Sequence, residues 1–326
     1  MVSFRARFAA ALTARGYRVA ASTDEADIRA ALVIGGTRHL EQLWQLKRRG
    51  VRIVQRLDGM NWIHRLRRTG LRHFLRSEYG NWILNTIRTR FADHIVYQSA
   101  FSHDWWTRVY GAAPVPSSVV HNAVPPHEYT PQGPHQRPAD RYRLLLVEGS
   151  LGGGYEIGLE TAVELAAALN TRHRAALGKP VELFVLGRVS ERVRAACRVD
   201  FPLTFGGVVP RERIPEMDRS AHVLYAADIN GACPNAVIEA LACGLPVVSF
   251  DTGALPELVT GDAGRIVPYG GDPWKLEPPD LSVLADATVD VLLAQPRFRT
   301  AARARAEAAF DLERMLDGYL CALEGG

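Results

Sequence analysis

The sequence predicts an α/β protein built from two Rossmann-like domains with parallel sheets. Short β-branched runs alternate with stretches of helical period from one end of the chain to the other, which is typical of parallel strands joined by crossover helices. A proline-rich segment, residues 125–141, interrupts this alternation once. The length of 326 residues fits two domains, at roughly 150 residues per domain.

Five strands and three helices are expected before the interruption. The expected strands are Tyr17–Ala21, Ala31–Gly35, Val51–Leu57, His94–Ser99 and Ser117–His121. The expected helices are Phe4–Thr13, Leu40–Arg49 and Trp62–Arg90. Ligands of open parallel sheets bind beyond the carboxyl ends of the strands, so Gly35, Asp58 and Ser99 are candidate cleft residues, with helix caps and turns as their alternative roles.

A second open parallel sheet is predicted after the interruption. Its expected strands are Arg143–Glu148, Val181–Leu186, Leu203–Val208, Val223–Ala226 and Pro246–Ser249. The expected helices are Glu156–Leu169, Glu191–Arg198, Arg211–Arg219 and Pro234–Ala242. We therefore expect an N-terminal domain over 1–124, a linker over 125–141 and a C-terminal domain over 142–304, with a last helix at about 305–326 that packs back on the first domain.

Composition indicates an ordinary globular protein of the cytoplasm. Hydrophobic residues make up 47% and charged residues 23% of the chain, which excludes disordered, collagen-like and disulfide-scaffold classes. Charged residues interrupt every apolar run before the roughly 18 residues that a membrane-spanning helix requires. The four cysteines are widely spaced, so no zinc site or redox pair is suggested.

One segment, residues 231–257, carries the most specific pattern. Glu239 lies in a predicted helix and is followed by Ala-Leu-Ala-Cys-Gly-Leu-Pro-Val-Val, then by Thr-Gly-Ala-Leu-Pro-Glu after Asp251. This pattern resembles the sugar-nucleotide half of glycosyltransferase family 4, the group 1 glycosyltransferases. Weaker matches follow the family's order at residues 92–99, at 121–124, and at 264–272, which resembles a late turn of the family.

The resemblance implies a GT-B fold, in which two Rossmann-like domains face each other across a cleft. It also implies a retaining transferase that needs no metal and moves a sugar from a nucleotide-sugar donor to a glycan, lipid-linked or small-molecule acceptor. The sequence agrees on the metal, because no Asp-x-Asp occurs anywhere in it. No cofactor is therefore expected besides the donor substrate.

Several donor-site residues follow from the resemblance. Glu239 matches the second glutamate of the family's Glu-seven residues-Glu pattern, whose carboxylate accepts hydrogen bonds from the ribose hydroxyls; such bonds contribute about 1.5–3 kcal/mol each. Asn235 is assigned to the same site. Val208 ends the segment that matches the one whose backbone reads the nucleobase in the family. A solvated helix glutamate and a plain strand end are the alternative interpretations.

The phosphate-binding part departs from the family. The first glutamate of the pattern falls on Gly231, and the family's Arg and Lys after the first strand of this domain are absent. As a partial substitute, the backbone N–H groups of Gly152, Gly153 and Gly154 are expected to approach phosphate oxygens at a helix N-terminus. Arg188, at a strand end, either supplies a cation to the same cleft or is a plain surface residue.

In the first half, Asp58 lies where the family places a His or His-Asp at the cleft. It is the candidate for orienting the acceptor hydroxyl, as a base, with capping of the next helix as the alternative. Family members also usually open with a strand before the helix expected at Phe4–Thr13. We therefore expect either an abbreviated acceptor domain or a chain start that omits native residues.

Arginines concentrate between residues 62 and 76. Arg65, Arg68, Arg72 and Arg76 recur at three and four residues and so share one helix face. This face suits peripheral contact with the cytoplasmic face of a membrane or an anionic acceptor, or it is simply solvated. No nucleic-acid partner is expected, because no recognised fold signature accompanies the cluster.

Two other classes of function compete with the transferase. The missing Arg, Lys and first glutamate also fit a GT-B-shaped binding or scaffolding protein whose donor site has decayed. A nicotinamide dehydrogenase is disfavoured, because no Gly-x-Gly-x-x-Gly opens a helix after a strand.

Overall fold

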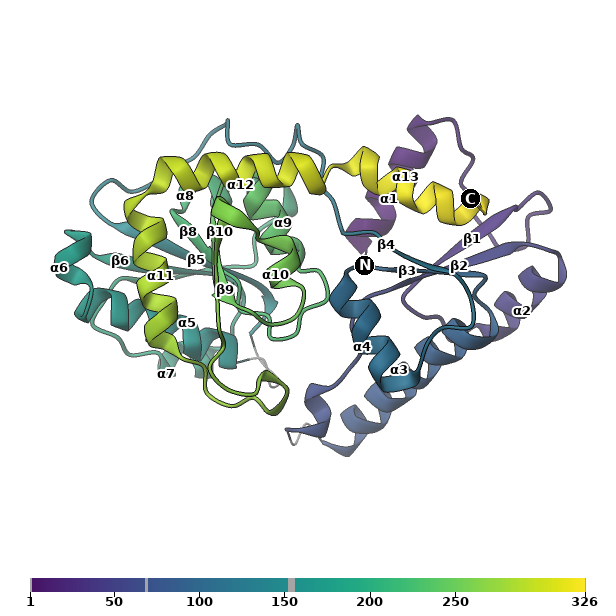
Figure 1. The fold of residues 1–326 in the computed structure, drawn as a ribbon, viewed down its shortest axis with the longest axis horizontal. Coiled ribbons are helices and arrows are strands. Elements are labelled where there is room, and N and C mark those ends of the chain that lie inside the picture. The colour runs from purple at the N-terminus through teal and green to yellow at the C-terminus, as the bar shows by residue number, and fades with distance from the viewer. Residues whose placement is uncertain (1, 68–69, 152–155, 326) are drawn as a thin grey trace. The chain divides into compact units, whose positions relative to one another are not determined.

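The computed structural model describes residues 2–67, 70–151 and 156–325. The chain divides into two compact units (Figure 1). Unit 1 contains Met1–Asn122 and Leu312–Gly326, and unit 2 contains Ala123–Asp311. Each holds one parallel sheet, so the predicted α/β fold with two Rossmann-like domains is confirmed.

The sheet of unit 1 has four parallel strands whose spatial order follows the chain. The strands are β1 (Ala30–Ile34), β2 (Arg52–Leu57), β3 (His94–Tyr97) and β4 (Ser117–Val119). Because crossovers between parallel strands are right-handed and every step runs in the same direction, the three connecting helices belong on one face. These helices are α2 (Leu40–Arg48), α3 (Leu71–Arg90) and α4 (Ala100–Tyr110).

The opposite face of this sheet is covered by the two ends of the chain. Helix α13 (Leu312–Glu324) contacts β1, β2 and β3, and α1 (Val2–Ala14) packs on α13. Both helices lie across the sheet from α3 and α4 in Figure 1. The Tyr319 ring of α13 lies 5.4 Å from the Phe4 ring and 5.1 Å from the Phe8 ring, measured between centroids. A helix from the far end of the sequence therefore completes the core of unit 1.

Two predictions for unit 1 were wrong. Residues 17–21 form no strand: Tyr17 and Val19 are exposed and pair with neither edge of the four-stranded sheet. The helix expected over Trp62–Arg90 is divided into a 3₁₀ turn, η1 (Ile63–Arg65), and α3, which begins after Gly70. Gly70 has a φ of 88°, a left-handed conformation that stops a helix and that glycine adopts at little cost.

Unit 2 has six parallel strands in the order β10-β9-β8-β5-β6-β7. They are β5 (Tyr142–Ser150), β6 (Val181–Arg188), β7 (Leu203–Gly207), β8 (Val223–Tyr225), β9 (Val247–Phe250) and β10 (Gly264–Val267). Strand β10 covers residues expected to form only a late turn. The chain builds outwards from β5 to β7 and then returns to place β8 on the other side of β5. This reversal is the switch point at which open α/β sheets bind their ligands.

Helices cover this sheet and connect its strands. They are α5 (Ile157–Thr171), α6 (Arg174–Leu177), α7 (Glu191–Ala196), η2 (Arg211–Arg213), α8 (Ile214–Ser220), α9 (Asn235–Ala242), α10 (Leu255–Leu258), η3 (Gly261–Ala263), η4 (Pro273–Lys275), α11 (Leu281–Leu293) and α12 (Gln295–Ala309). No helix in the described ranges has both the length and the apolar character needed to cross a membrane.

The proline-rich segment, expected as a linker, packs on unit 2. Tyr129 is only 1% exposed. Arg303 donates from Nη1 to the carbonyl of Tyr129 at 2.7 Å, and Arg219 donates to the carbonyls of Thr130 and Pro134. Two arginines, the buried Arg219 of α8 and the partly buried Arg303 of α12, therefore fix the path of this segment.

A carboxyl group is buried between α8 and α9. Asp218 is 1% exposed, accepts a hydrogen bond from the Cys243 thiol, and has no hydrogen-bond partner at Oδ2. Burial, and next the negative charge of Glu239, raise the pKa of Asp218 well above its usual value. Ionised Asp218 therefore costs folding free energy at neutral pH.

We predict that Asp218→Asn stabilises the folded protein at neutral pH. The free energy of unfolding should rise by about 1 kcal/mol or more, and the thermal unfolding temperature should rise with it. The folded-state pKa lies above the unfolded one, so the wild-type protein binds more protons when folded and gains stability as the pH falls. The difference in stability between the variant and the wild type should consequently narrow as the pH falls from neutral to acid values. A variant that is less stable at every pH would contradict this account.

Candidate donor site

A cavity of about 230 Å³ opens at the carboxyl ends of β5 and β8, at the switch point of unit 2. It is lined by the end of β5, by residues 224–228 and by the first turns of α9. Two predicted donor-site residues, Asn235 and Glu239, are among its lining residues. The strand order therefore places the most specific sequence motif at the position where such sheets bind ligands.

The N-terminus of α9 faces this cavity without a side-chain cap. Pro234 occupies the cap position and makes no side-chain capping hydrogen bond to the helix. Asn235, Ala236 and Val237 line the cavity from this first turn. The N–H groups of the first turn and the helix dipole together make this end of α9 a suitable place for a phosphate group.

Glu239 is held in position by a chain of hydrogen bonds. The Tyr129 hydroxyl donates to Glu239 Oε1 at 3.2 Å, and Arg211 Nε donates to the same hydroxyl oxygen at 3.3 Å. Burial alone lowers the pKa of Arg211, but the hydrogen bond to Tyr129 and the charge of Glu239 raise it overall, so the guanidinium stays charged. Arg211 Nη2 is buried and has no hydrogen-bond partner among the described residues. The proline-rich segment thus contributes a positioning residue to the site.

Glu148 and Asp228 form a pair of carboxyl groups in the same cavity. Burial, and then the charge of Asp228, raise the pKa of Glu148 well above its usual value; burial also raises the pKa of Asp228. Two neighbouring carboxylates do not ionise independently, so the pair retains a proton above the pH at which either would lose it in water. The cavity is consequently less negative than its three acidic side chains suggest.

Asp228 occupies the space that a side chain at position 231 would need. A Cβ built on Gly231 would lie 3.0 Å from Asp228 Cβ and 3.2 Å from Asp228 Oδ2. The carboxyl group of Asp228 therefore lies beside the position from which the family's first glutamate would extend.

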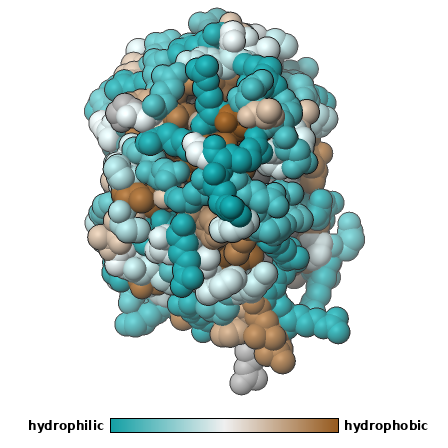
Figure 2. Space-filling model, turned by 90° about the vertical axis from the view of Figure 1, so that its right-hand side faces the viewer, coloured by the Kyte–Doolittle hydropathy of each residue, from teal (hydrophilic) through white to brown (hydrophobic). Residues whose placement is uncertain are grey.

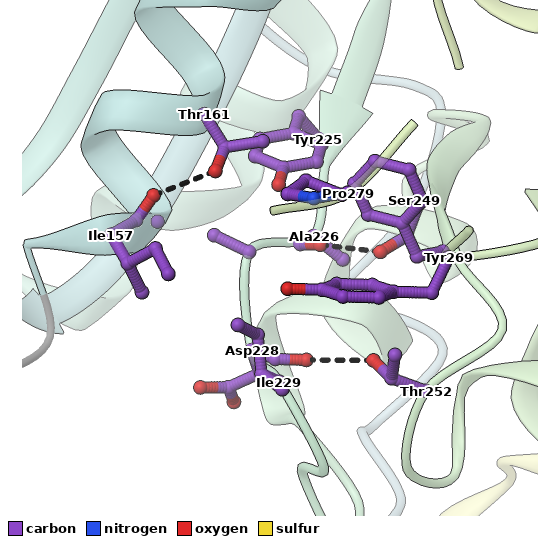
Figure 3. Close-up of a pocket in the computed structure, with 13 residues that line it drawn as sticks. Ile157, Thr161, Tyr225, Ala226, Asp228, Ile229, Ser249, Thr252, Tyr269 and Pro279 are labelled. Atoms are coloured by element: carbon purple, nitrogen blue, oxygen red, sulfur yellow. Dashed lines mark hydrogen bonds between the residues drawn. The ribbon is translucent and has the colours of Figure 1, made fainter. Parts of the chain in front are cut away.

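Side chains behind Asp228 fix its backbone. Thr252 Oγ1 donates to the Asp228 carbonyl at 3.5 Å, and Ser249 Oγ donates to the Ala226 carbonyl (Figure 3). The Asp228 carboxylate points away from the Tyr269 ring in this view. The hollow that these residues line measures about 10 Å³, room for no more than one water molecule, so it serves to hold the loop.

The other predicted donor residues lie outside the cavity lining. Arg188 ends β6 and is exposed, and its carbonyl accepts from the Leu151 N–H at 2.9 Å. It therefore lies beside the end of β5, at the predicted sheet edge, but does not line the cavity. Val208 follows β7 and is 68% exposed. Gly152, Gly153 and Gly154 fall outside the described residues, so their predicted phosphate contact stays a prediction.

Asp58 lies at the carboxyl end of β2 in unit 1, where the sequence predicted it. Its carbonyl accepts from Ser102 Oγ at 2.8 Å and from Trp106 Nε1 at 2.7 Å. Burial raises the pKa of its carboxyl group, while the charge of Arg56 opposes that shift. Ser99, a second candidate at this edge, caps α4 by accepting from the Ser102 N–H. Ser99 therefore has a capping role, and Asp58 remains the candidate for the acceptor side.

The four arginines expected on one helix face do not share a helix. Arg65 lies in η1 and is paired with Glu78 through bonds of 2.6 and 2.9 Å, whereas Arg72 and Arg76 are exposed on α3. Arg68 lies outside the described residues. The turn at Gly70 breaks the helical spacing on which the expectation depended.

Tyr129, Arg211, Glu148 and Asp228 were not recognised as site residues from the sequence. Glu148 ends one predicted strand and Asp228 closely follows another, so the carboxyl-end rule was a signal for both. No pattern in the proline-rich segment predicts that Tyr129 contacts a helix more than 100 residues away in the sequence. Within the described residues, no three His, Cys, Asp or Glu side chains are grouped so as to hold a metal ion.

Comparison with known proteins shows which family and which solved structures the chain resembles. Residues 144–292 match the family model described as "Glycosyl transferases group 1". A search of curated proteins gave no match. The chain is similar to the solved structure of sucrose-phosphate synthase from Thermosynechococcus elongatus, with a TM-score of 0.66 and 17% identity over 98% of this chain and 76% of that one.

Two further structures show the same fold. WaaG, a glycosyltransferase involved in lipopolysaccharide biosynthesis, matches with a TM-score of 0.67 and 16% identity over 98% of this chain and 95% of that chain. HepE from Anabaena, solved with UDP and glucose, matches with a TM-score of 0.63 and 15% identity over 90% and 78%. The predicted resemblance and the predicted enzyme class, a glycosyltransferase, are confirmed. Residues 144–292 form a group 1 glycosyltransferase domain, within a chain that has the GT-B fold.

Proposed function

We propose that this protein is a retaining glycosyltransferase that uses a nucleotide-sugar donor without a metal ion. The observation that carries the proposal is the position of Glu239 and the uncapped N-terminus of α9 in one cavity, at the switch point of a sheet in a group 1 glycosyltransferase domain. A carboxylate for the ribose hydroxyls and N–H donors for phosphate are the two kinds of group that a nucleotide diphosphate requires. HepE, which has the same fold, was solved with UDP.

The N-terminus of α9 takes on much of the phosphate binding in this proposal. No arginine or lysine lines the cavity in the part of the chain that the structure describes. A helix N-terminus contributes about 0.3–1 kcal/mol toward a charged group, less than the two cations of the family would supply. Burial raises the pKa values of Glu148 and Asp228, and uptake of a proton by this pair lowers the repulsion that a diphosphate meets in the cavity.

Asp228 is proposed to supply the carboxyl group that relatives draw from the first glutamate. It lies beside the site of that missing side chain, and it is a partly buried residue of the cavity lining. A carboxyl group there accepts hydrogen bonds from hydroxyls of the transferred sugar. A carboxyl group is thus kept at this place in the site, but it comes from position 228 and not from position 231.

On the acceptor side, Asp58 is proposed to orient the acceptor hydroxyl. That hydroxyl oxygen bonds to the anomeric carbon on the face from which the diphosphate departs, which retains the configuration, and the diphosphate leaves with the electron pair. A carboxylate of raised pKa is a better acceptor for the hydroxyl proton than one of ordinary pKa. We further propose a cytoplasmic role in the assembly of a glycan or a glycoconjugate.

A second candidate is a binding or scaffolding protein with a decayed donor site. The absence of the family's Arg and Lys and the glycine at position 231 favour it. Calorimetric titration with UDP, GDP and their sugars distinguishes the two. The transferase is expected to bind at least one nucleotide, and the absence of any binding at millimolar concentration would leave the scaffold.

Glu239→Ala is expected to weaken nucleotide binding by about 1.5 kcal/mol or more, because the ribose loses a charge-assisted hydrogen bond. The same calorimetric titration measures it. Glu160→Ala, an exposed glutamate of α5, is the matched control and should leave the affinity unchanged. Equal affinity in both variants would remove Glu239 from the donor site.

Tyr129→Phe removes the hydroxyl that orients Glu239 but leaves the buried ring in place. Nucleotide affinity should fall by about 1 kcal/mol, the usual net contribution of a hydrogen bond. Tyr269→Phe is the control, since that hydroxyl donates to the Glu277 carbonyl, outside the cavity lining. Loss of affinity in the control alone would show that Tyr129 does not position Glu239.

Asp228→Asn should lower the rate of sugar transfer about ten-fold to a hundred-fold, as expected for the loss of a hydrogen bond to a charged group. The free nucleotide lacks the sugar, so its affinity should change much less than the affinity for the nucleotide-sugar. A screen of nucleotide-sugars for transfer and hydrolysis identifies the donor first. Equal losses of affinity for nucleotide and nucleotide-sugar would contradict a role toward the sugar.

A further inference from the structure

Helix α3 exposes a row of large apolar side chains. Six of the fourteen large hydrophobic residues that are exposed in the described part of the chain lie in its first three turns or just before them. We call this set the apolar ridge; its members are Leu66, Leu71, Phe74, Leu75, Tyr79 and Trp82. Such a concentration is larger than the scattered apolar residues that any surface carries.

The ridge is not the core face of α3. Leu71, Leu75, Tyr79 and Trp82 follow one another at spacings of four, four and three residues, which places them on one side of the helix. The buried side of α3 is made by other residues, among them Ser77, Asn81, Ile83, Ile87 and Arg88. The packing of unit 1 therefore gives no reason for apolar side chains at the ridge positions.

The ridge is extended and partly rigid. Leu71 is 74% and Trp82 is 55% exposed. The rings of Tyr79 and Trp82 stack with centroids 5.8 Å apart, which orders the end of the ridge. Figure 2 shows the side of the molecule that lies on the right in Figure 1. Apolar side chains project at its lower edge, with hydrophilic side chains beside them.

Positive charge borders the ridge. Arg72 and Arg76 are exposed on α3, next to Leu71 and Leu75 in sequence. Glu78 is the one acidic residue of the helix, and it already accepts hydrogen bonds from Arg65 and His64. The arginine charge on this flank is therefore not balanced within the helix.

We propose that the apolar ridge docks on an anionic lipid bilayer. Leu71, Leu75 and Trp82 enter the boundary between headgroups and acyl chains, and Arg72 and Arg76 contact lipid phosphates. Aromatic residues with a polar edge favour this depth, and basic residues near an anionic surface add to the attraction. A second copy of the chain is a poorer occupant, since it would bring the same arginines together. The proposal concerns unit 1 alone and does not depend on the proposed transfer reaction.

Co-sedimentation of the full chain with vesicles tests the proposal. With equimolar phosphatidylcholine and phosphatidylglycerol, the wild-type protein should pellet, and it should pellet much less with phosphatidylcholine alone. Leu75→Ser combined with Trp82→Ser should lower the partition coefficient at least about ten-fold, since two side chains lose their contact with acyl chains. Arg72→Gln and Arg76→Gln should each lower it about five-fold, which corresponds to ~1 kcal/mol per basic residue.

Trp44→Ser is the matched control. Trp44 lies on α2 of the same unit and is 53% exposed, close to the 55% of Trp82. Its replacement should leave vesicle binding unchanged. Circular dichroism confirms that each variant is folded. The proposal is overturned if the wild-type chain stays in the supernatant, if it binds both kinds of vesicle equally, or if sedimentation velocity shows a dimer that only the ridge variant loses.

Discussion

The right-handedness of the connections between parallel strands is the constraint on which both units depend. In unit 2 the chain reverses its direction of growth after β7 and places β8 beside β5. Loops after these two strands then diverge, and a cavity remains between them. In unit 1 the four strands follow one another without reversal, so all connecting helices fall on one face. The other face would be bare if α13 did not return from the end of the chain to cover it.

Charge in the donor cavity follows from this topology. Strand β5 carries Glu148 near its carboxyl end, Asp228 follows β8, and α9 carries Glu239, so these three residues line one small cavity. Burial and the charge of Asp228 raise the pKa of Glu148, which disfavours two full negative charges side by side, and Tyr129 and Arg211 stabilise Glu239. The cations of the family are absent from the cavity lining that the structure describes, and their place is taken in part by a helix N-terminus. The site thus differs from its relatives in how it balances charge.

The turn before helix α3 changes which residues of the arginine-rich segment share a helix face. Continuous helix from Trp62 onward would have placed four arginines on one face. The left-handed turn at Gly70 restarts the helix, separates Arg65 from Arg72, and turns a row of apolar side chains toward solvent. The feature of the surface of unit 1 that needs a functional reason is the exposure of those side chains, not the spacing of the arginines.

The sequence by itself determined the fold class, most of the strands and the position of the central motif. Alternating periods are local, and Glu239 with the glycine and proline that follow it is recognisable within one segment. The tertiary structure alone decided which residues meet: that Tyr129 reaches Glu239, that Asp228 fills the space beside Gly231, and that residues 17–21 join no sheet. These contacts join residues far apart in sequence or depend on side-chain packing. Periodicity reports the face on which a residue lies but not the neighbour that it finds there.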